Sequence, residues 1–323
     1  MTVTDMQIAG TSTEAWSHNE DTLLLTTGGL AGNQLQNVEV YPSTSSCTPP
    51  RLPRSRDTPA TFLTTQPNPT IAVCGGRDGH FATASCLVLD KSNQLWRRSG
   101  NLTMPRKDAA VASLNSVGVF IIGGGAANNQ RTSDFLAAGQ MQWQEGPALP
   151  MDMTNLCAVT ITPTSYLTIY DNHIREFDAA IAGPTTIEGW RDERRWPRLK
   201  SSRTAKPGCA KLGQKVIIAG GYNHGGEVLS STEVLNLNSR EITAGGDMAS
   251  PRSWFHLATI RRGGEEKVFA LGGWMDGSTV LNTVEELVEV EESTTWEKAD
   301  SFLTERRGYF GTVALPKELI CPA

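Results

Sequence analysis

Histidine and tyrosine, which supply many catalytic and metal-binding groups, are scarce in this chain. Only five of its 323 residues are histidine and five are tyrosine, and the histidines are scattered along the sequence. The motifs HExxH and GxSxG, the P-loop, and a GxGxxG after a strand are all missing. No cysteine or histidine cluster has the spacing of a zinc site. We therefore predict a protein that is not an enzyme and that uses neither a metal nor a cofactor.

Long apolar runs and strongly basic faces are also missing. The longest apolar run, 117–127, is broken by three glycines and is shorter than the ~20 residues that a membrane helix needs. The segment 1–20 has neither the positive start nor the apolar core of a signal peptide, which leaves open a cytoplasmic protein or one whose leader has been removed. The formal net charge is −5, so we do not expect nucleic-acid binding. Because a long apolar run is missing, we also do not expect membrane insertion.

Glycine, by contrast, is abundant, at 31 residues, and part of it stands in a repeat. Apolar segments that end in a glycine pair recur roughly every 50 residues, with one interval about twice as long. Within that interval SYLTIYDN carries Tyr170 and Asp171 at the glycine positions, which makes six units. The other five segments are LLLTTGG (23–29), TIAVCGG (70–76), GVFIIGG (118–124), KVIIAGG (215–221) and KVFALGG (267–273).

Each unit contains four short segments in a fixed order. The first is often opened by arginine, and the last is often marked by tryptophan. Because the segments are short, rich in Val, Ile, Leu and Thr, and bounded by Gly, Pro, Asn and Ser, they indicate strands. The opening residues are Arg56, Arg106, Arg252 and Arg306, with arginine-less versions from Thr154 and Lys206. The tryptophans are Trp96, Trp143, Trp190 or Trp196, and Trp296.

Four antiparallel strands in about 50 residues correspond to one blade of a β-propeller. We predict an all-β, six-bladed propeller over 21–316, between an N-terminal segment 1–20 and a tail 317–323. The second strands should start near residues 23, 70, 118, 165, 215 and 267. The first glycine strand has no partner before it, while the strand after Arg306 is left over. The C-terminal strand should therefore complete blade one and hide its edge.

The repeat resembles the kelch motif from about Leu23 to Leu315. The resemblance rests on the glycine pair, the third strand ending in an aromatic residue (VEVY, 38–41), the tryptophan and the Pro-Arg before the next unit. It implies closure by the C-terminal strand, and a binding face formed by the loops after the glycine pairs and by the starts of the first strands. The partner-binding residues would be Arg77, Asp78, His80, Arg106, Lys107, Asn128, Tyr222, Asn223, His224, Arg252, Trp254, Trp274, Asp276, Arg306, Arg307 and Tyr309.

This set is rich in arginine and aromatic residues, which dominate binding hot spots. Since arginine grips carboxylates with two hydrogen bonds, we predict a non-enzymatic scaffold that binds a partner protein or an acidic peptide. The opening arginines could instead be structural and bond loop carbonyls between blades. Two alternatives stay open. One is an intracellular kelch substrate adaptor or cytoskeletal scaffold, and the other is a glycan-binding or enzymatic propeller of the oxidase or mutarotase kind.

Six cysteines, none in a CxxC pair, allow disulfides. Cys74 ends a glycine strand and Cys86 lies in the next strand of the same hairpin, so we predict a bridge between them, with buried free thiols as the alternative. Cysteine beside the glycine pair resembles a group of secreted-looking invertebrate kelch proteins, which favours an extracellular location over a cytoplasmic one. The other pairings are less certain and involve Cys47 with Cys321, and Cys157 and Cys209 in the first strands of successive blades.

Overall fold

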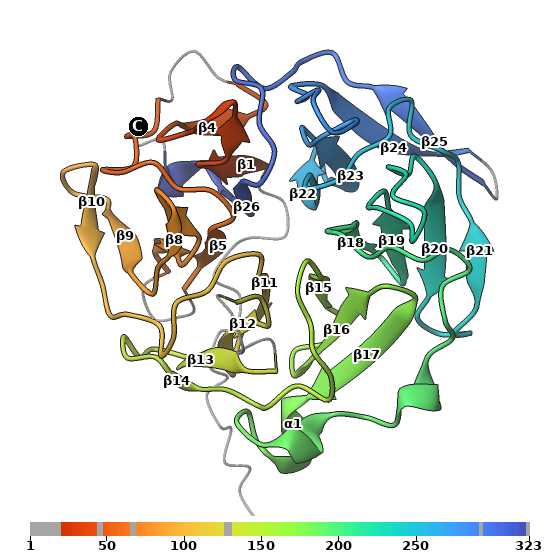
Figure 1. Cartoon of the computed structure of the whole chain (residues 1–323), viewed down its shortest axis with the longest axis horizontal. Helices are drawn as coiled ribbons and strands as arrows, with labels where there is room; N and C mark the ends of the chain where they lie inside the picture. The colour runs from red at the N-terminus through yellow and green to blue at the C-terminus, as the bar shows by residue number, and fades with distance from the viewer. Residues whose placement is uncertain (1–20, 44–47, 65–68, 126–130, 291–292, 321–323) are drawn as a thin grey trace, which may run out of the picture.

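A computed structural model describes residues 21–43, 48–64, 69–125, 131–290 and 293–320. In it, six antiparallel sheets stand around a central axis like the blades of a propeller (Figure 1). The prediction of an all-β, six-bladed propeller is therefore confirmed. None of the described helices is long and apolar enough to cross a membrane.

Within each blade the strands follow one another from the axis outward, and the innermost strands of neighbouring blades contact each other around the ring. Blade one contains β26 (Gly311–Pro316), β1 (Thr22–Thr27) and β4 (Val38–Tyr41). Blade two contains β5 (Ala60–Leu63), β6 (Ile71–Cys74), β9 (Cys86–Asp90) and β10 (Leu95–Arg98). Blade three contains β11 (Ala110–Leu114), β12 (Gly118–Ile122), β13 (Ser133–Ala137) and β14 (Gln144–Glu145).

Blade four contains β15 (Cys157–Thr160), β16 (Ser165–Tyr170) and β17 (His173–Asp178). Blade five contains β18 (Gly208–Leu212), β19 (Lys215–Ala219), β20 (Thr232–Asn236) and β21 (Ile242–Ala244). Blade six contains β22 (His256–Arg262), β23 (Glu265–Leu271), β24 (Val284–Val290) and β25 (Ser293–Lys298). The small elements are β2 (Leu30–Ala31), β3 (Asn33–Gln34), β7 (Arg77–Asp78), β8 (Phe81–Ala82), α1 (Ala179–Ala182), η1 (Ile187–Gly189), η2 (Glu193–Arg195) and η3 (Lys317–Leu319).

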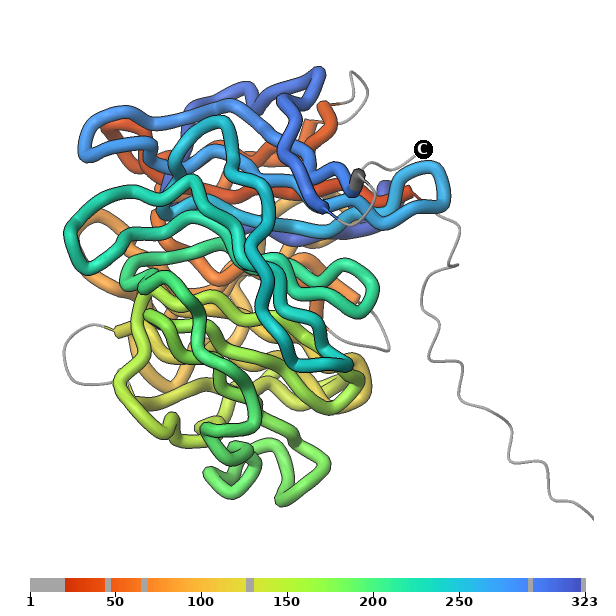
Figure 2. Tube along the Cα trace, turned by 90° about the vertical axis from the view of Figure 1, so that its right-hand side faces the viewer, coloured from red at the N-terminus to blue at the C-terminus, as the bar shows by residue number. Residues whose placement is uncertain are grey.

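The two ends of the described chain meet in blade one, as predicted. Strand β26 pairs antiparallel with β1 over its whole length, from Thr22 opposite Pro316 to Thr27 opposite Gly311. In the side view the first, red strand lies among the blue C-terminal segments (Figure 2). The C-terminal strand thereby supplies the inner strand of blade one and closes the ring.

Six apolar clusters hold the ring together, one at each contact between neighbouring blades. The fourth-position tryptophans take part in these contacts. Trp143 of blade three packs edge-on against Phe62 of blade two, with ring centroids 5.8 Å apart. The indole N–H of Trp296 donates to Thr232 Oγ1 of blade five at 2.9 Å. In blade four the fourth-position tryptophan is Trp190, which forms an isolated antiparallel β-bridge with Phe177.

The glycine pairs stand where one blade meets the next. Gly28 has a φ of +62°, and a Cβ added there would lie 2.1 Å from the backbone oxygen of Arg56 in blade two. Only glycine fits that approach. In blade four Tyr170 is still in the strand and pairs with His173. It therefore does not take a glycine position, and Asp171, with a φ of +54°, begins a tight turn instead. Blade four consequently lacks the long loop of its neighbours.

Five buried arginines brace five of the blades: Arg56, Arg106, Arg203, Arg252 and Arg307. Each sends its Nη1 group to the carbonyl of the first glycine of the pair and to the carbonyl just before the third strand. For Arg252 these acceptors are Gly272 at 2.7 Å and Thr283 at 3.0 Å. A carboxylate also pairs with four of the five: Asp134 with Arg106, Glu233 with Arg203, Glu285 with Arg252 and Glu39 with Arg307.

Blade five corrects one detail of the sequence interpretation. We expected its first strand to begin, without an arginine, at Lys206. Arg203 instead fills the arginine position, with Nη1 2.7 Å from the Gly220 oxygen. Arg203 precedes its strand by five residues, whereas Arg252 precedes its strand by four. The extra residue hid the correspondence.

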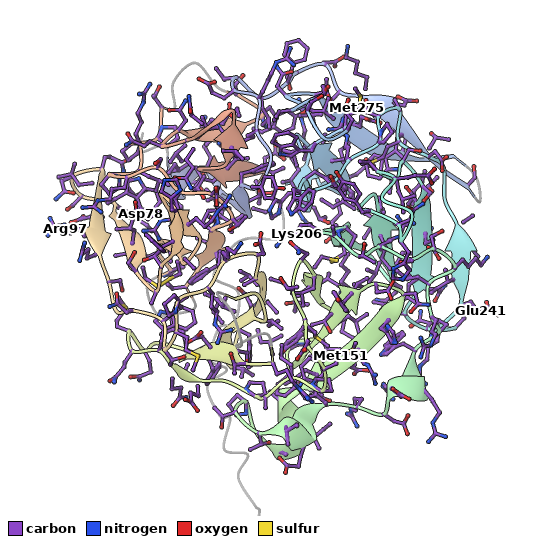
Figure 3. All side chains as sticks on the ribbon, in the orientation of Figure 1. Asp78, Arg97, Met151, Lys206, Glu241 and Met275 are labelled. Carbon is purple, nitrogen blue, oxygen red and sulfur yellow. A yellow bond between two sulfur atoms is a disulfide. The ribbon has the colours of Figure 1, made fainter. Side chains whose placement is uncertain are left out.

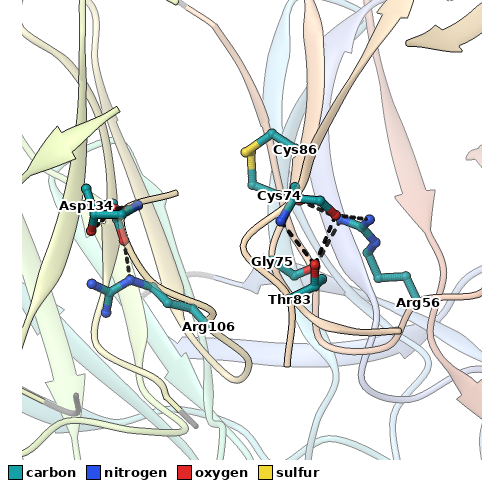
Figure 4. The surroundings of a disulfide bond; sticks show 9 residues. Arg56, Cys74, Gly75, Thr83, Cys86, Arg106 and Asp134 are labelled. Atoms are coloured by element: carbon teal, nitrogen blue, oxygen red, sulfur yellow. Dashed lines mark hydrogen bonds and ion pairs between the residues drawn. A yellow bond between two sulfur atoms is a disulfide. The ribbon is translucent and has the colours of Figure 1, made fainter. Parts of the chain in front are cut away.

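Two disulfides fasten the blades. Cys74 and Cys86 are bridged within blade two, as predicted (Figure 4). Cys157 and Cys209 are bridged between the inner strands of blades four and five. Cys47 and Cys321 lie outside the described residues. The second bridge spans 52 residues in sequence and the first spans 12.

Removing the longer bridge should cost more stability. In the chain-entropy model a bridge over 52 residues is worth about 4 kcal/mol, and one over 12 residues about 3 kcal/mol. We therefore expect Cys157→Ser with Cys209→Ser to lower the free energy of unfolding by about 1 kcal/mol more than Cys74→Ser with Cys86→Ser. Urea unfolding of both double variants measures the difference. Full alkylation of these cysteines in the denatured, unreduced wild type would contradict both bridges.

Candidate functional site

One residue of each blade, just before the inner strand, has a left-handed backbone: Thr58, Asp108, Asn155, Lys206, Trp254 and Tyr309. Non-glycine residues rarely adopt this conformation, and such residues concentrate at functional sites. Four of them, from blades two, five, six and one, line a cavity of about 170 Å³ in the centre of the ring. These residues and the neighbouring loops are called the channel mouth below.

Apolar and small side chains form most of the cavity wall below the mouth, among them Phe255, Leu257 and Phe310. The bridge between Cys157 and Cys209 also lines it. The Nε2–H group of His256 donates a hydrogen bond to the Phe310 oxygen at 2.7 Å. Burial and the nearby Lys206 lower the pKa of His256 to about 4, so its ring is neutral at pH 7. The cavity can therefore take a small, largely apolar group behind the mouth.

Four aromatic side chains form a connected rim over three blades. The rings of Trp254 and Tyr309 lie 4.7 Å apart, and Tyr222 meets Trp254 edge-on at 5.2 Å. Trp274 meets Tyr309 edge-on at 6.0 Å. All four are partly exposed, and the indole of Trp254 is fixed by Asn155 Oδ1 at 3.3 Å. Partly exposed aromatic rings held in place are typical anchors for a binding partner.

The ammonium group of Lys206 lies at the channel mouth, near the centre of the ring (Figure 3). The side chain reaches from blade five to blade three, where Nζ donates to the Ala109 oxygen at 2.8 Å. No described carboxylate forms an ion pair with it. Burial lowers the pKa of Lys206 to about 8, although Asp108 acts in the opposite direction. At pH 7 the ammonium group is therefore a partly desolvated cation. It has N–H donors beyond the one that Ala109 accepts.

Other charges at the mouth are paired. Both oxygens of the buried Asp57 bind the guanidinium of Arg77, at 2.9 and 2.8 Å, and this contact raises the pKa of Arg77. Asp108 Oδ2 lies 3.5 Å from Lys107 Nζ, while its other oxygen and the hydroxyl of Thr58 have no hydrogen-bond partner. Among the described residues no group of three or more His, Cys, Asp or Glu is arranged to hold a metal ion.

The residues expected to bind a partner fall into three groups in the structure. Those at the mouth are Arg77, Lys107, Tyr222, Trp254, Trp274 and Tyr309. Those in the surrounding loops are Asp78, His80, Asn223, His224, Asp276 and Arg306. Asp276 organises its own loop, since hydrogen bonds from the Ser278 and Thr279 amides and hydroxyls lower its pKa to about 2. Asn128 lies outside the described residues.

Three arginines expected at the binding face have a structural role instead. Arg106, Arg252 and Arg307 are at most 1% exposed, and their guanidinium groups bond backbone carbonyls and paired carboxylates. Figure 4 shows Arg106 beside Asp134. A partner on the surface cannot reach them. The sequence interpretation in turn missed Thr58, Asn155 and Lys206. Counting two residues back from the start of each inner strand would have found their shared position.

Comparisons with known proteins assign the chain to no family. No family model matches the sequence, and no curated protein matches it. The structure shows the class of fold, a six-bladed β-propeller with two disulfides. Its channel mouth combines aromatic rings with an ammonium group.

Proposed function

We propose that the protein is a non-enzymatic interaction scaffold of the kelch type that binds a partner protein through an acidic segment at the channel mouth. The observation that carries this proposal is the ammonium group of Lys206, which lies in the mouth with one backbone acceptor and, among the described residues, no paired carboxylate. A buried cation is favourable only when an anion or several acceptors compensate its lost hydration. A carboxylate of the partner supplies that compensation.

The remaining charges at the mouth do not oppose an acidic ligand. Asp57 is neutralised by Arg77, and Asp108 has Lys107 close by. The excess charge at the mouth is therefore that of Lys206. The preference for an acidic ligand, first inferred from the arginines of the first strands, rests here on Lys206 because those arginines are buried.

The aromatic rim adds contact area next to this charge. Trp254 and Tyr309 contribute large rings at low conformational cost, and they lie beside the cavity that Lys206 lines. A segment with a carboxylate next to an apolar side chain matches this arrangement. The two disulfides support an oxidising, extracellular compartment as part of the same proposal.

Selection from a random peptide library displayed on phage tests the proposal without a known partner. We expect the wild type to enrich peptides with Asp or Glu. For a selected peptide, replacing Glu by Gln should weaken binding by roughly tenfold, as for a partly desolvated charge pair. Lys206→Met should remove this difference while leaving the melting temperature within a few degrees of wild type.

The matched control is Lys215→Met, which removes a lysine whose Nζ is paired with Glu289 on the outside of the ring. It should keep the Glu preference, whereas Trp254→Ala should weaken the Glu and Gln peptides alike. Enrichment of peptides without acidic residues, or the same enriched set for Lys206→Met and wild type, would contradict the proposal.

A further inference from the structure

A second polar site lies on blade four and shares no lining residue with the central cavity. The segment that leads from blade four to blade five, 191–200, reads RDERRWPRLK, and η2 lies within it. Together with β17 it encloses a pocket of about 280 Å³. The pocket is lined by His173, Ile174, Arg175, Glu193, Arg194, Trp196, Pro197 and Arg198.

Positive charge exceeds negative charge in this pocket. Glu193 is paired with Arg175 at 2.6 Å. Arg194 pairs with Asp192, which lies just outside the lining residues, at 3.1 Å. Within the part of the chain that the structure describes, Arg198 has only a neutral acceptor, the amide oxygen of Asn172 at 3.3 Å. Three arginines thus face one carboxylate among the lining residues, in a protein whose overall net charge is −5.

The unused polar atoms of the pocket can donate hydrogen bonds. The Nε of Arg175 and the Nδ1 of His173 are buried, and no described residue forms a hydrogen bond with either atom. Burial lowers the pKa of His173, and Arg198 and Arg175 lower it further, while Asp171 and Glu193 act in the opposite direction. Once protonated, a histidine ring donates from both nitrogens. An anion would therefore satisfy several groups that the protein leaves unsatisfied.

We propose that this blade-four pocket binds a tetrahedral oxyanion, the phosphate or sulfate group of a partner molecule, through Arg198, Arg194 and His173. Guanidinium groups suit such anions because they present several N–H donors in one plane. Pro197 and Trp196 supply uncharged parts of the pocket lining. This site is independent of the acidic-segment site at the channel mouth.

Binding should strengthen as the pH falls. An anion beside His173 favours the charged ring and raises its pKa, so the complex takes up a proton that the free protein does not hold. By linkage, affinity then rises as the pH drops toward the pKa of His173 in the complex. Sulfate is the right probe for this dependence because it does not titrate in the range, whereas phosphate esters have a pKa near 6.

Isothermal titration of the whole protein with sodium sulfate and sodium phosphate, at constant ionic strength with chloride, tests the site. We expect saturable binding of one anion, weakened about tenfold in Arg194→Gln with Arg198→Gln, as two charge-assisted contacts imply. The control, Arg97→Gln with Arg131→Gln, removes the same charge from two other exposed arginines and should keep the wild-type affinity. No saturable binding, or equal loss in the control, overturns the proposal.

The variant His173→Asn tests whether the pH dependence of sulfate binding comes from His173 or from the general positive charge of the pocket. This variant should still bind sulfate at pH 7 but should lose the increase in affinity at lower pH, and an unchanged pH dependence would remove His173 from the site. Phosphoserine and glucosamine 6-sulfate then identify the source of the group by their relative affinities. Lys206→Met should leave all of these affinities unchanged, so failure at one site is distinguishable from failure at the other.

Discussion

Replacing Arg252 by methionine should lower the free energy of unfolding by about 3–5 kcal/mol, the usual cost of breaking a buried ion pair. Arg252 is fully buried and donates to Gly272, Thr283 and Glu285. Methionine fills part of the volume but satisfies none of these acceptors. The carboxylate of Glu285, 2% exposed, is then left without its cation. Chemical denaturation with urea, followed by far-ultraviolet circular dichroism, measures the loss.

Two further variants identify the cause. Adding Glu285→Gln to Arg252→Met should recover part of the loss, because an amide is less costly to bury than an unpaired carboxylate. Arg306→Met is the control, since this neighbouring arginine is exposed and donates only to the Val280 oxygen at 3.3 Å. It should change stability by no more than about 0.5 kcal/mol. A similar loss in both single variants would contradict a specific role for the buried arginine.

Deleting residues 304–323 should abolish cooperative folding. The deletion removes β26 and with it every hydrogen bond on the inner edge of β1. It also removes Arg307, whose Nη1 bonds the Gly28 oxygen at 3.0 Å, and Phe310 from the cluster between blades six and one. An exposed strand edge invites association between chains. Thermal melting and size-exclusion chromatography should show no sharp transition and aggregated protein.

A peptide of residues 304–320 supplied in trans provides the control. It should restore a cooperative transition to the truncated chain, because it carries β26, Arg307 and η3. The same peptide with Arg307 and Phe310 replaced by alanine should fail to do so. A truncated chain that is monomeric and melts cooperatively without any peptide would refute the closure of blade one by β26.

The number of blades and their closure could be predicted because they depend on the order of local patterns. The glycine pairs mark one strand in each blade, and even blade four, which has lost them, keeps the spacing. The surplus strand after Arg306 indicated how the ring closes. These inferences need no knowledge of which side chains meet in space, since the strands follow one another along the chain in every blade except the first.

The role of the opening arginines could not be predicted in the same way. The sequence pattern of an arginine at the start of a strand is the same whether its side chain points to solvent or into the blade. For Arg252 the answer depends on Glu285, which lies 33 residues later in sequence. Arg203 was missed altogether, because one extra residue separates it from β18. Long-range partners, not local composition, decide whether such a side chain is buried.

Lys206 shows the same limit at the candidate site. Its position before a strand suggested only a variant of the opening arginine, and its functional interest comes from reaching the Ala109 oxygen, 97 residues away in sequence. The aromatic rim was easier to predict, since Tyr222, Trp254, Trp274 and Tyr309 all stand in loops or strand starts of the expected face. Residue type and repeat position identify the face, but folding across blades identifies the charge at its centre.

The pairing of β1 with β26 has a consequence for the synthesis of the protein. The ribosome makes β1 well before its inner partner β26, because the two strands lie at opposite ends of the propeller sequence. At the usual 5–20 residues per second, β1 waits roughly 15–60 s for that partner. During this time the nascent chain presents the free edge of a strand made only of Leu and Thr residues. Protection of that edge by a chaperone until the last strand emerges is therefore expected to govern the yield of native protein in the cell.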